Sequence, residues 1–272
     1  MLTFASILSA LLAPLARAET APFEPAAVFA QNAPPPPMPY WKGALAAGAV
    51  WTDGNSVTSS ANASFNAERR DEKDRYTYDA YFNYADNETD SIGTPGATDV
   101  EVTQRNFGAG AKYDYFATEK MYYLANVSGK HDGVSELYLR YIVGAGVGYQ
   151  VREDEKIKWG VETGLAYVNE DYDPSDLPSE DPDARGFALR LASNLAWQIS
   201  ETTAFEQNAE VLPSLEESED LIARVDNRLK LNITASWIAQ LQYVLDYDDD
   251  TPSGVEEADH RVVFGLGWTF GA

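Results

Sequence analysis

The final stretch of the chain alternates large apolar residues with small or polar ones at a strict period of two. Its apolar positions are Val262, Phe264, Leu266, Trp268 and Phe270. Arginine, valine, glycine and threonine occupy the positions between them. Because successive side chains of a strand point to opposite faces, this pattern predicts a strand with one face against lipid and the other towards a crowded or aqueous interior.

Composition narrows the class of protein that could contain such a strand. The mean hydropathy is −0.35 and the one long apolar run lies at the start, so a bundle of transmembrane helices is excluded. The chain of 272 residues has no cysteine, so disulfides do not stabilise it, whereas a closed barrel is held by its own hydrogen-bond ladder. A formal net charge of −23 argues against nucleic-acid binding, which needs a basic face.

The N-terminal residues have the composition of export and spacer segments. Residues 2–15 form an apolar run, and Ala16-Arg17-Ala18 fits a signal-peptidase cleavage site, so residues 1–18 are predicted to be a signal peptide. Residues 19–40 are rich in proline, with four consecutive prolines at 34–37, and are predicted to be a disordered tether. Residues 41–272 are left for a single folded domain.

From residue 41 onward, strand-like segments follow one another. We expect strands at residues 41–51, 56–69, 75–85, 103–115, 120–130, 137–151, 156–169, 185–199, 203–212, 220–233, 237–247 and 259–270. Most of them reach the roughly 9–11 residues that a tilted strand needs to cross a bilayer. The sequence therefore predicts an all-β fold, an antiparallel transmembrane β-barrel of about 12 strands, whose even count returns both ends to the periplasm.

The connections between these segments alternate in length. Short ones lie at 70–74, 117–119, 152–155, 200–202 and 234–236, and the long ones at 86–102, 170–184 and 248–258 fall between them. Short periplasmic turns and long extracellular loops are typical of outer-membrane barrels. Five of the six tryptophans also fall at strand ends on the short-turn side, where an interface girdle is expected. A soluble secreted β-sandwich, the alternative fold, has no reason to show either feature.

The start of the predicted domain carries the pattern of a known family. A Trp41-x-Gly43 strand leads into the turn Thr52-Asp-Gly-Asn-Ser56, and a small-residue segment at 61–65 precedes the basic-acidic turn 69–75. Over residues 41–270 the chain resembles the salt-induced outer-membrane protein family, a domain-of-unknown-function family numbered 481. The resemblance implies the outer membrane of a Gram-negative bacterium and no established activity. It also implies that the barrel-assembly machinery reads Trp268 and Phe270 as an assembly signal.

Inward positions, assigned by parity, gather charge on three neighbouring strands. The candidate lumen-lining residues are Arg190, Glu206, Glu210, Arg224, Arg228 and Lys230. They predict either a cross-strand salt-bridge ladder that fills the lumen or a charged constriction in a pore. Glycines at 144, 146 and 148 also point inwards and leave room for large side chains from other strands.

Four polar residues carry the outward parity instead, namely Thr163, Ser193, Gln207 and Asn227. A polar group that faces hydrocarbon without a partner is unfavourable. Local bulges that turn these residues inwards, or a second copy or partner protein on this face, would each account for them.

The sequence offers little for catalysis. His131 and His260 are the only imidazole bases and no nucleophile motif accompanies them, so an outer-membrane lipid-modifying hydrolase is kept only as the alternative. The acidic loops do not have the spacing of a calcium loop. We therefore expect no catalytic residue, no cofactor and no bound metal. The predicted protein is a structural or stress-related barrel or a narrow channel, with outer-membrane lipid, lipopolysaccharide and the assembly machinery as partners and its oligomeric state open.

Overall fold

The computed structural model describes residues 41–52, 57–90, 98–172, 184–216, 220–249, 251 and 256–271. The predicted signal peptide and proline-rich tether lie outside these ranges. Within them, no helix is long and apolar enough to cross a membrane.

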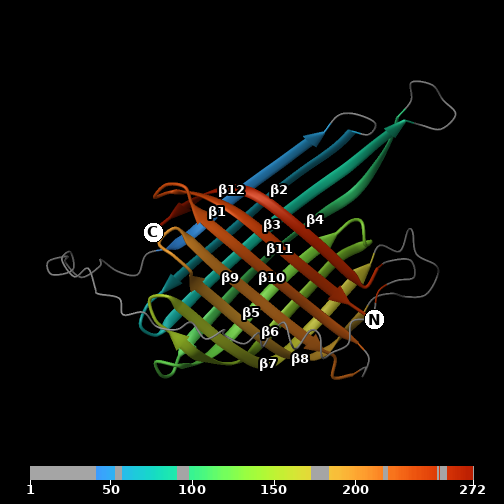
Figure 1. Ribbon diagram of the computed structural model, residues 1–272. Coiled ribbons are helices and arrows are strands. Elements are labelled where there is room, and N and C mark those ends of the chain that lie inside the picture. The colour runs from blue at the N-terminus through green and yellow to red at the C-terminus, as the bar shows by residue number, and fades with distance from the viewer. Residues whose placement is uncertain are drawn as a thin grey trace, which may run out of the picture. The chain divides into compact units, whose positions relative to one another are not determined.

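The described chain is built from twelve strands. They are β1 (Lys42–Thr52), β2 (Val57–Arg70), β3 (Asp74–Asp90), β4 (Thr98–Phe116), β5 (Met121–Asp132), β6 (Leu137–Glu153), β7 (Ile157–Tyr172), β8 (Ala184–Gln198), β9 (Thr203–Pro213), β10 (Leu221–Asn232), β11 (Trp237–Asp248) and β12 (Ala258–Phe270). Each strand pairs antiparallel with its neighbours in sequence, and β1 pairs with β12, so the sheet closes into a barrel (Figure 1). The predicted fold is confirmed, and the β-sandwich alternative was wrong.

The strand bounds follow the predicted ones closely, except in the hairpin of β3 and β4 and at the end of β7, which was expected at residue 169 and lies at Tyr172. Residues 86–102 were expected to form a loop, but β3 continues to Asp90 and β4 starts at Thr98. The register of this pair shifts between Ala85 and Asp86, which marks a β-bulge. Beyond the bulge β3 is polar and lacks the apolar alternation on which the prediction depended, and β4 shows only Val100 and Val102, although the two backbones still pair.

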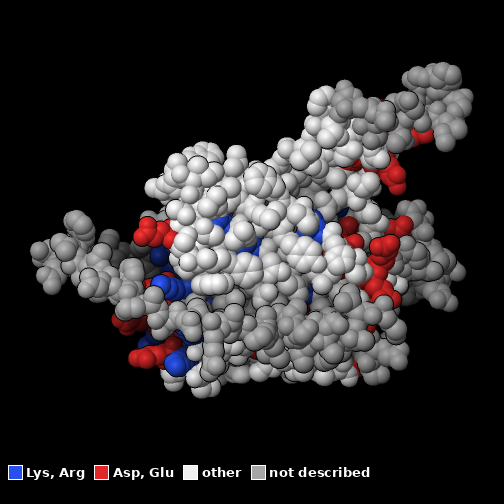
Figure 2. All heavy atoms as spheres, viewed as in Figure 1, with Lys and Arg blue, Asp and Glu red and all other residues white. Residues whose placement is uncertain are grey.

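The two faces of the barrel differ in chemistry. Outward side chains form an exposed apolar belt that includes Leu45, Phe107, Tyr123, Leu165 and Phe264. Figure 2 shows a largely uncharged outer wall, with acidic residues gathered at the end of the long connections and mixed charges at the end of the short turns. Charged and small side chains point inwards. This arrangement is the reverse of a water-soluble protein, in which the apolar side chains form the interior.

Three of the four outward polar residues, Ser193, Gln207 and Asn227, are not turned inwards by bulges, and Thr163 stays exposed on the outer face. Among the described strands the register shifts lie in β3, β5 and β6, away from Ser193, Gln207 and Asn227. Gln207 and Asn227 face each other across β9 and β10, and Gln207 Nε2 donates to Asn227 Oδ1 at 2.8 Å. Trp159 Nε1 donates to Ser193 Oγ at 3.1 Å. Mutual hydrogen bonding, rather than a bulge, therefore satisfies these groups.

Closure of the barrel is asymmetric along its height. The β1/β12 ladder runs only from Gly43↔Phe270 to Ala47↔Leu266. On its other side β1 pairs with β2 along its whole length, from Lys42↔Glu68 to Thr52↔Thr58. Likewise, β12 pairs with β11 from Trp237↔Trp268 to Tyr247↔Ala258. In Figure 1 the far ends of β1 and β12 diverge. The seam between them is therefore paired only in the half next to the short turns.

Candidate functional site

The inward face of the barrel surrounds a cavity of about 790 Å³. It is lined from Lys42, Thr269 and Phe270 at the short-turn end to Glu256 and Glu257 at the other end. The predicted lumen-lining charges Arg190, Glu206, Glu210, Arg224, Arg228 and Lys230 all border this cavity. The cavity is thus the place where the charged side chains of the wall meet.

The pairing of these six residues differs from a simple glutamate ladder. Arg190 Nε donates to Glu210 Oε1 at 2.9 Å, and Lys230 Nζ donates to Glu206 at 2.7 Å. Arg224 lies opposite Glu210 in the β9/β10 register, yet its ion pair is with Asp246 of β11, at 2.6 Å.

Arg228 behaves in the same way. It lies opposite Glu206 in the register but forms its ion pair with Asp226 of its own strand, at 2.6 Å. Parity therefore assigned the face of each residue, whereas side-chain reach selected the partner.

The structure adds four residues to this cluster that the sequence did not single out. These four residues and two of the predicted ones form a row of alternating basic and acidic side chains, which we call the charge chain: Arg75, Asp114, Lys112, Glu162, Arg190 and Glu210. Glu162 is its central member, because Lys112, Arg190 and the Tyr122 hydroxyl all donate to its carboxylate. The side chains of Glu162 and Asp114 are fully buried. Inward parity was the one sequence signal that pointed to these residues.

Glycines make room for the charge chain, as expected. Lys112 on β4 reaches Glu162 on β7 across the two intervening strands β5 and β6. Gly148 on β6 lies directly beneath the Tyr122 ring, and a Cβ atom on Gly160 would lie 3.2 Å from the Tyr122 hydroxyl oxygen. Since a side chain at Gly148 would occupy the space of that ring, the glycine allows Tyr122 to fold flat against the wall and donate to Glu162.

A second cluster crosses the lumen behind the seam. Arg224 of β10 and Arg261 of β12 share the carboxylate of Asp246, at 2.6 and 3.2 Å. Both guanidinium groups lie over the ring of Tyr81, 5.1 and 5.8 Å from its centroid. Tyr81 belongs to β3, which four strands separate from β10. These cation–π contacts therefore join distant walls of the barrel.

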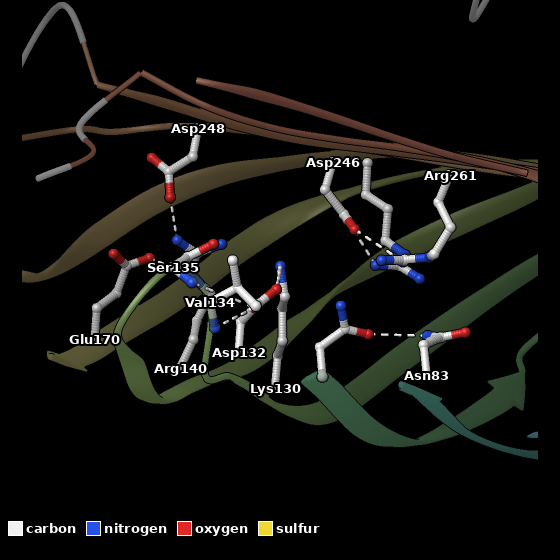
Figure 3. A network of polar contacts seen from close by, with 12 residues as sticks. Asn83, Lys130, Asp132, Val134, Ser135, Arg140, Glu170, Asp246, Asp248 and Arg261 are labelled. Carbon is white, nitrogen blue, oxygen red and sulfur yellow. Dashed lines mark hydrogen bonds and ion pairs between the residues drawn. The ribbon is translucent and has the colours of Figure 1, made fainter. Parts of the chain in front are cut away.

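A third cluster lies at the end of the long connections (Figure 3). Arg140 of β6 forms ion pairs with Glu170 of β7 and with Asp248 of β11. Strands β7 to β10 separate β6 from β11, so the contact with Asp248 bridges nearly opposite walls. Tyr172 donates to Glu170 at 3.0 Å. The bridge narrows the lumen at this height.

The carboxylates of Asp220, Asp248 and Asp249 lie close enough together to hold a cation. Arg140 already contacts one of them, and the Leu221 amide donates to another. The cluster is therefore at least partly neutralised by the protein itself.

The two histidines have partners other than a nucleophile. His131 Nδ1 lies 2.8 Å from the Tyr138 carbonyl oxygen, and His260 Nδ1 lies 2.9 Å from the Tyr243 hydroxyl. Among the described residues neither ring hydrogen bonds to a serine. This geometry gives no support to the hydrolase alternative.

The predicted assembly-signal residues lie at the paired half of the seam. Phe270 pairs with Gly43 of β1, and its ring stacks on Phe65 with centroids 6.4 Å apart. Trp268 pairs with Leu45 and lies 5.9 Å from the Phe270 ring. The last aromatic residues thus contribute to barrel closure itself.

Comparison with known proteins places this geometry in a family. Residues 45–270 match the model of a family described as protein of unknown function, DUF481. The chain belongs to the DUF481 family. The match covers every strand of the barrel in whole or in part and agrees with the family expected from the Trp41–Ser56 pattern. No curated protein matches this DUF481 chain.

Solved structures include other barrels that resemble this DUF481 protein. The NanC porin has 8% identity and a TM-score of 0.46, over 84% of this chain and 100% of that one. The translocator domain of autotransporter NalP from Neisseria meningitidis has 12% identity and a TM-score of 0.41, over 85% and 87%. The transport unit of the autotransporter AIDA-I from Escherichia coli has 10% identity and a TM-score of 0.36, over 90% and 94%. Similarities at this level carry no inference about activity.

Proposed function

We propose that this DUF481 protein is a narrow channel in the outer membrane of a Gram-negative bacterium, and that it favours small cations over anions. The cavity of about 790 Å³, bordered by residues from both ends of the barrel, is the observation that carries the proposal. The exposed apolar belt supports a membrane location, because such a surface would cause aggregation in water.

The exposed fractions of the side chains in two ion pairs support the proposed preference for cations as the transported ions. The side chains of Glu206 and Glu210 retain 30% and 32% exposure, whereas their partners Lys230 and Arg190 retain 12% and 5%. In these two pairs the cation is buried against the wall and the carboxylate faces the lumen. An ion that passes this part of the lumen therefore meets these two carboxylates first, whereas at the Arg224–Asp246 pair the cation is the more exposed partner, at 32% against 15%. The net charge of −23 supplies the wider negative field.

The orientation follows from the connections. The short turns lie in the periplasm and the long connections lie outside the cell, as is general for such barrels. Tryptophans at strand ends, such as Trp197, Trp237 and Trp268, would then mark the periplasmic interface. The predicted signal peptide supplies export, and outer-membrane lipid, lipopolysaccharide and the assembly machinery are the partners.

The contacts across the lumen limit the size of the solute. The Arg140–Asp248 bridge and the charge chain each occupy part of the cross-section. We therefore propose hydrated monovalent ions or similarly small solutes rather than oligosaccharides.

Planar-bilayer recording of the purified, heat-modifiable protein tests the channel. A gradient of potassium chloride should give a reversal potential of the sign expected for cation preference. Glu206→Gln with Glu210→Gln should shift it towards anions, whereas Glu201→Gln, in a turn outside the cavity, should leave it unchanged. A folded protein that carries no current would refute the channel.

A further inference from the structure

The hairpin of β3 and β4 carries a free sheet edge at the end of the long connections. Strand β4 pairs with β3 from Thr98 to Tyr115, but its pairing with β5 begins only at Asn106. Among the described residues no other strand pairs with β4 between 98 and 104. In Figure 1 this tip of the hairpin extends beyond the neighbouring strands β5 and β6. A row of backbone N–H and C=O groups is therefore open for pairing.

This edge lies beyond the part of β4 that crosses the membrane. Residues 106–116 pair with β5 and already supply the roughly 9–11 residues that a tilted strand needs to cross a bilayer. The outward ring of Phe107 belongs to the apolar belt, whereas Arg105, two positions further towards the tip, is an exposed cation. An open edge would also be costly in hydrocarbon. Residues 98–104 therefore face water, where a second chain can reach them.

The free edge alternates acidic and apolar side chains. Asp99 and Glu101 point to one face of the hairpin, Val100 and Val102 point to the other, and all four are exposed. Neither Asp99 nor Glu101 has an ion-pair partner among the described residues. Neighbouring strands bring side chains of the same face side by side. An added strand would thus have alternate positions beside the two carboxylates and beside the two valines.

The surroundings of the edge are acidic as well. Residues 86–104 contain five acidic residues and no basic one. Asp86 and Glu88 of β3 lie opposite Val102 and Val100 in the register, so carboxylates flank the valines. Figure 2 shows acidic side chains on this projecting part of the barrel. A partner that lies along the edge therefore needs positive charge.

This combination selects among the possible occupants. A second copy of the chain would bring two acidic hairpins together, and the phosphate groups of lipids would be repelled. A free cation would use the carboxylates but neither the valines nor the open backbone. An extended peptide with basic and apolar residues at alternate positions would use all three.

We propose that residues 98–104 of β4 bind an extended cationic peptide segment, which adds to the sheet as a further strand. Its backbone pairs with the free edge, its basic residues lie beside Asp99 and Glu101, and its apolar residues cover Val100 and Val102. The segment belongs to a peptide or protein outside the cell. The inference rests on the outward orientation of the long connections in the proposed function, but not on ion conduction.

Fluorescence anisotropy of a labelled peptide tests the site on the folded protein in maltoside micelles. The probe is the peptide Lys-Val-Lys-Val-Lys-Val-Lys, and its control is Lys-Lys-Lys-Lys-Val-Val-Val, which has the same charge and composition. We expect the alternating peptide to bind more tightly. Asp99→Asn with Glu101→Gln should weaken this binding roughly tenfold, the value of two exposed ion pairs.

The matched control for the protein is Glu119→Gln with Glu201→Gln. It removes the same charge from exposed short turns at the other end of the barrel and should leave the affinity unchanged. Equal affinity for the two peptides, or an equal loss in the two variants, would overturn the site, because net charge alone would then explain the binding. Absence of binding to the alternating peptide would overturn it as well.

N-methylation tests whether the peptide backbone pairs with the edge. Alternate amides of an added strand face the sheet and the remaining ones face solvent. One peptide is methylated on its valine amides and another on its lysine amides, so the side chains and charge of both are unchanged. We expect one of the two peptides to lose its binding and the other to keep it. Equal behaviour of the two would overturn strand addition.

Thiol capture locates the bound peptide on the barrel. The chain has no cysteine, so single thiols can be introduced without background. Val100→Cys lies at the free edge, and Leu215→Cys is its control on the connection after β9, at the same end of the barrel. The two parent residues retain 59% and 58% exposure, so their thiols should be equally accessible. A bromoacetylated alternating peptide should alkylate Val100→Cys faster, and equal rates would overturn the location.

Two further results separate this site from the proposed function. Heat-modifiable migration first confirms that each variant is folded. A peptide that binds in micelles but not to intact cells would overturn only the outward orientation. Peptide binding by a protein that carries no current would overturn only the channel.

Discussion

Arg190 joins two carboxylates of different burial. Its Nη1 donates to Glu162 Oε2 and its Nε donates to Glu210 Oε1, each at 2.9 Å. The Glu162 side chain is fully buried, whereas that of Glu210 retains 32% exposure. One guanidinium group thus ties the inner wall to the part of the lumen that solvent reaches.

This difference predicts unequal costs for removing the two carboxylates. Glu162→Gln removes the buried carboxylate that Lys112 and Arg190 share, so one excess positive charge stays among these two cations and their other partners, Asp114 and Glu210. The free energy of unfolding should fall by on the order of 3–5 kcal/mol. Glu210→Gln should cost less than about 1 kcal/mol, because Arg190 keeps Glu162 and Glu210 is partly solvated. Urea titration of both variants in lipid vesicles measures the difference. Equal losses of unfolding free energy in the two variants would mean that water reaches the buried part of the charge chain.

The Arg140–Asp248 bridge predicts an effect on current. Arg140→Gln removes the cation that ties β6 to β11, so the side chains can withdraw to their own walls and the single-channel conductance should rise. Arg152→Gln is the matched control, because Arg152 pairs with Asp154 in an exposed turn. A fall in conductance, or the same change in both variants, would contradict a narrowing role for the bridge.

The topology of the barrel predicts which of its connections a protease can cleave from outside intact cells. Residues 170–184 and 248–258 contain the long, acidic connections and should be cut from outside. The turn at 152–155 should be protected until the cells are opened. Mass spectrometry of the fragments locates the cuts. Cleavage of that turn in intact cells would invert the assigned orientation.

Because β12 pairs with β1 over only part of its length, we predict that the aromatic residues of β12 contribute unequally to assembly of the barrel. Phe270→Ser removes the ring that stacks on Phe65 at the β1/β12 pair and should lower the heat-modifiable fraction. Phe264→Ser removes an outward ring that pairs only with β11, so it should have a smaller effect. Band densities of unheated samples compare the two. Indistinguishable yields would mean that Phe270 has no special part in assembly.

Two of the short turns predict that the stability of the folded barrel decreases at acid pH. In the turn after β6 the Ile157 amide, followed by Arg152, holds the pKa of Asp154 below its usual range. In the turn after β2 the Asp74 amide does the same for the pKa of Asp71. A lowered folded-state pKa contributes stability that is present above the unfolded pKa and is lost as pH falls through the folded one.

Unfolding of the wild type should therefore become easier from about pH 4 downward, near the unfolded Asp pKa. Asp71→Ala with Asp154→Ala should be less stable at neutral pH and should lose part of this acid sensitivity. Parallel pH curves for the two proteins would assign the sensitivity to other carboxylates.

The fold could be predicted from sequence because each strand needs only a local pattern. Period-two alternation and turn residues placed both bounds of nine of the twelve strands within two residues. Beyond Ala85 strand β3 carries no such alternation and β4 has only Val100 and Val102, so the continuation of the hairpin is shown by its backbone pairing. The signal peptide and the orientation of the barrel stay predictions.

The candidate site could be predicted only in part, because parity assigns a face but not a partner. Lys112 reaches Glu162 across β5 and β6, a distance in the barrel that no spacing in the sequence encodes. Arg224 had two carboxylates within reach across its strand, Glu210 and Asp246, and the register alone does not tell which of them it pairs with. The incomplete seam likewise follows from the stagger of whole strands rather than from any residue in it.

The position of Tyr122 over Gly148 makes the bore of the barrel adjustable by side chains alone. The ring rests on backbone that carries no Cβ atom, so its removal would enlarge the lumen and cost the hydrogen bond to Glu162, while every backbone hydrogen bond of the sheet stays in place. A barrel of fixed strand number, and hence fixed circumference, can in this way acquire different internal diameters. Tyr122→Ala or Tyr122→Trp would give a graded set of pores on one unchanged scaffold.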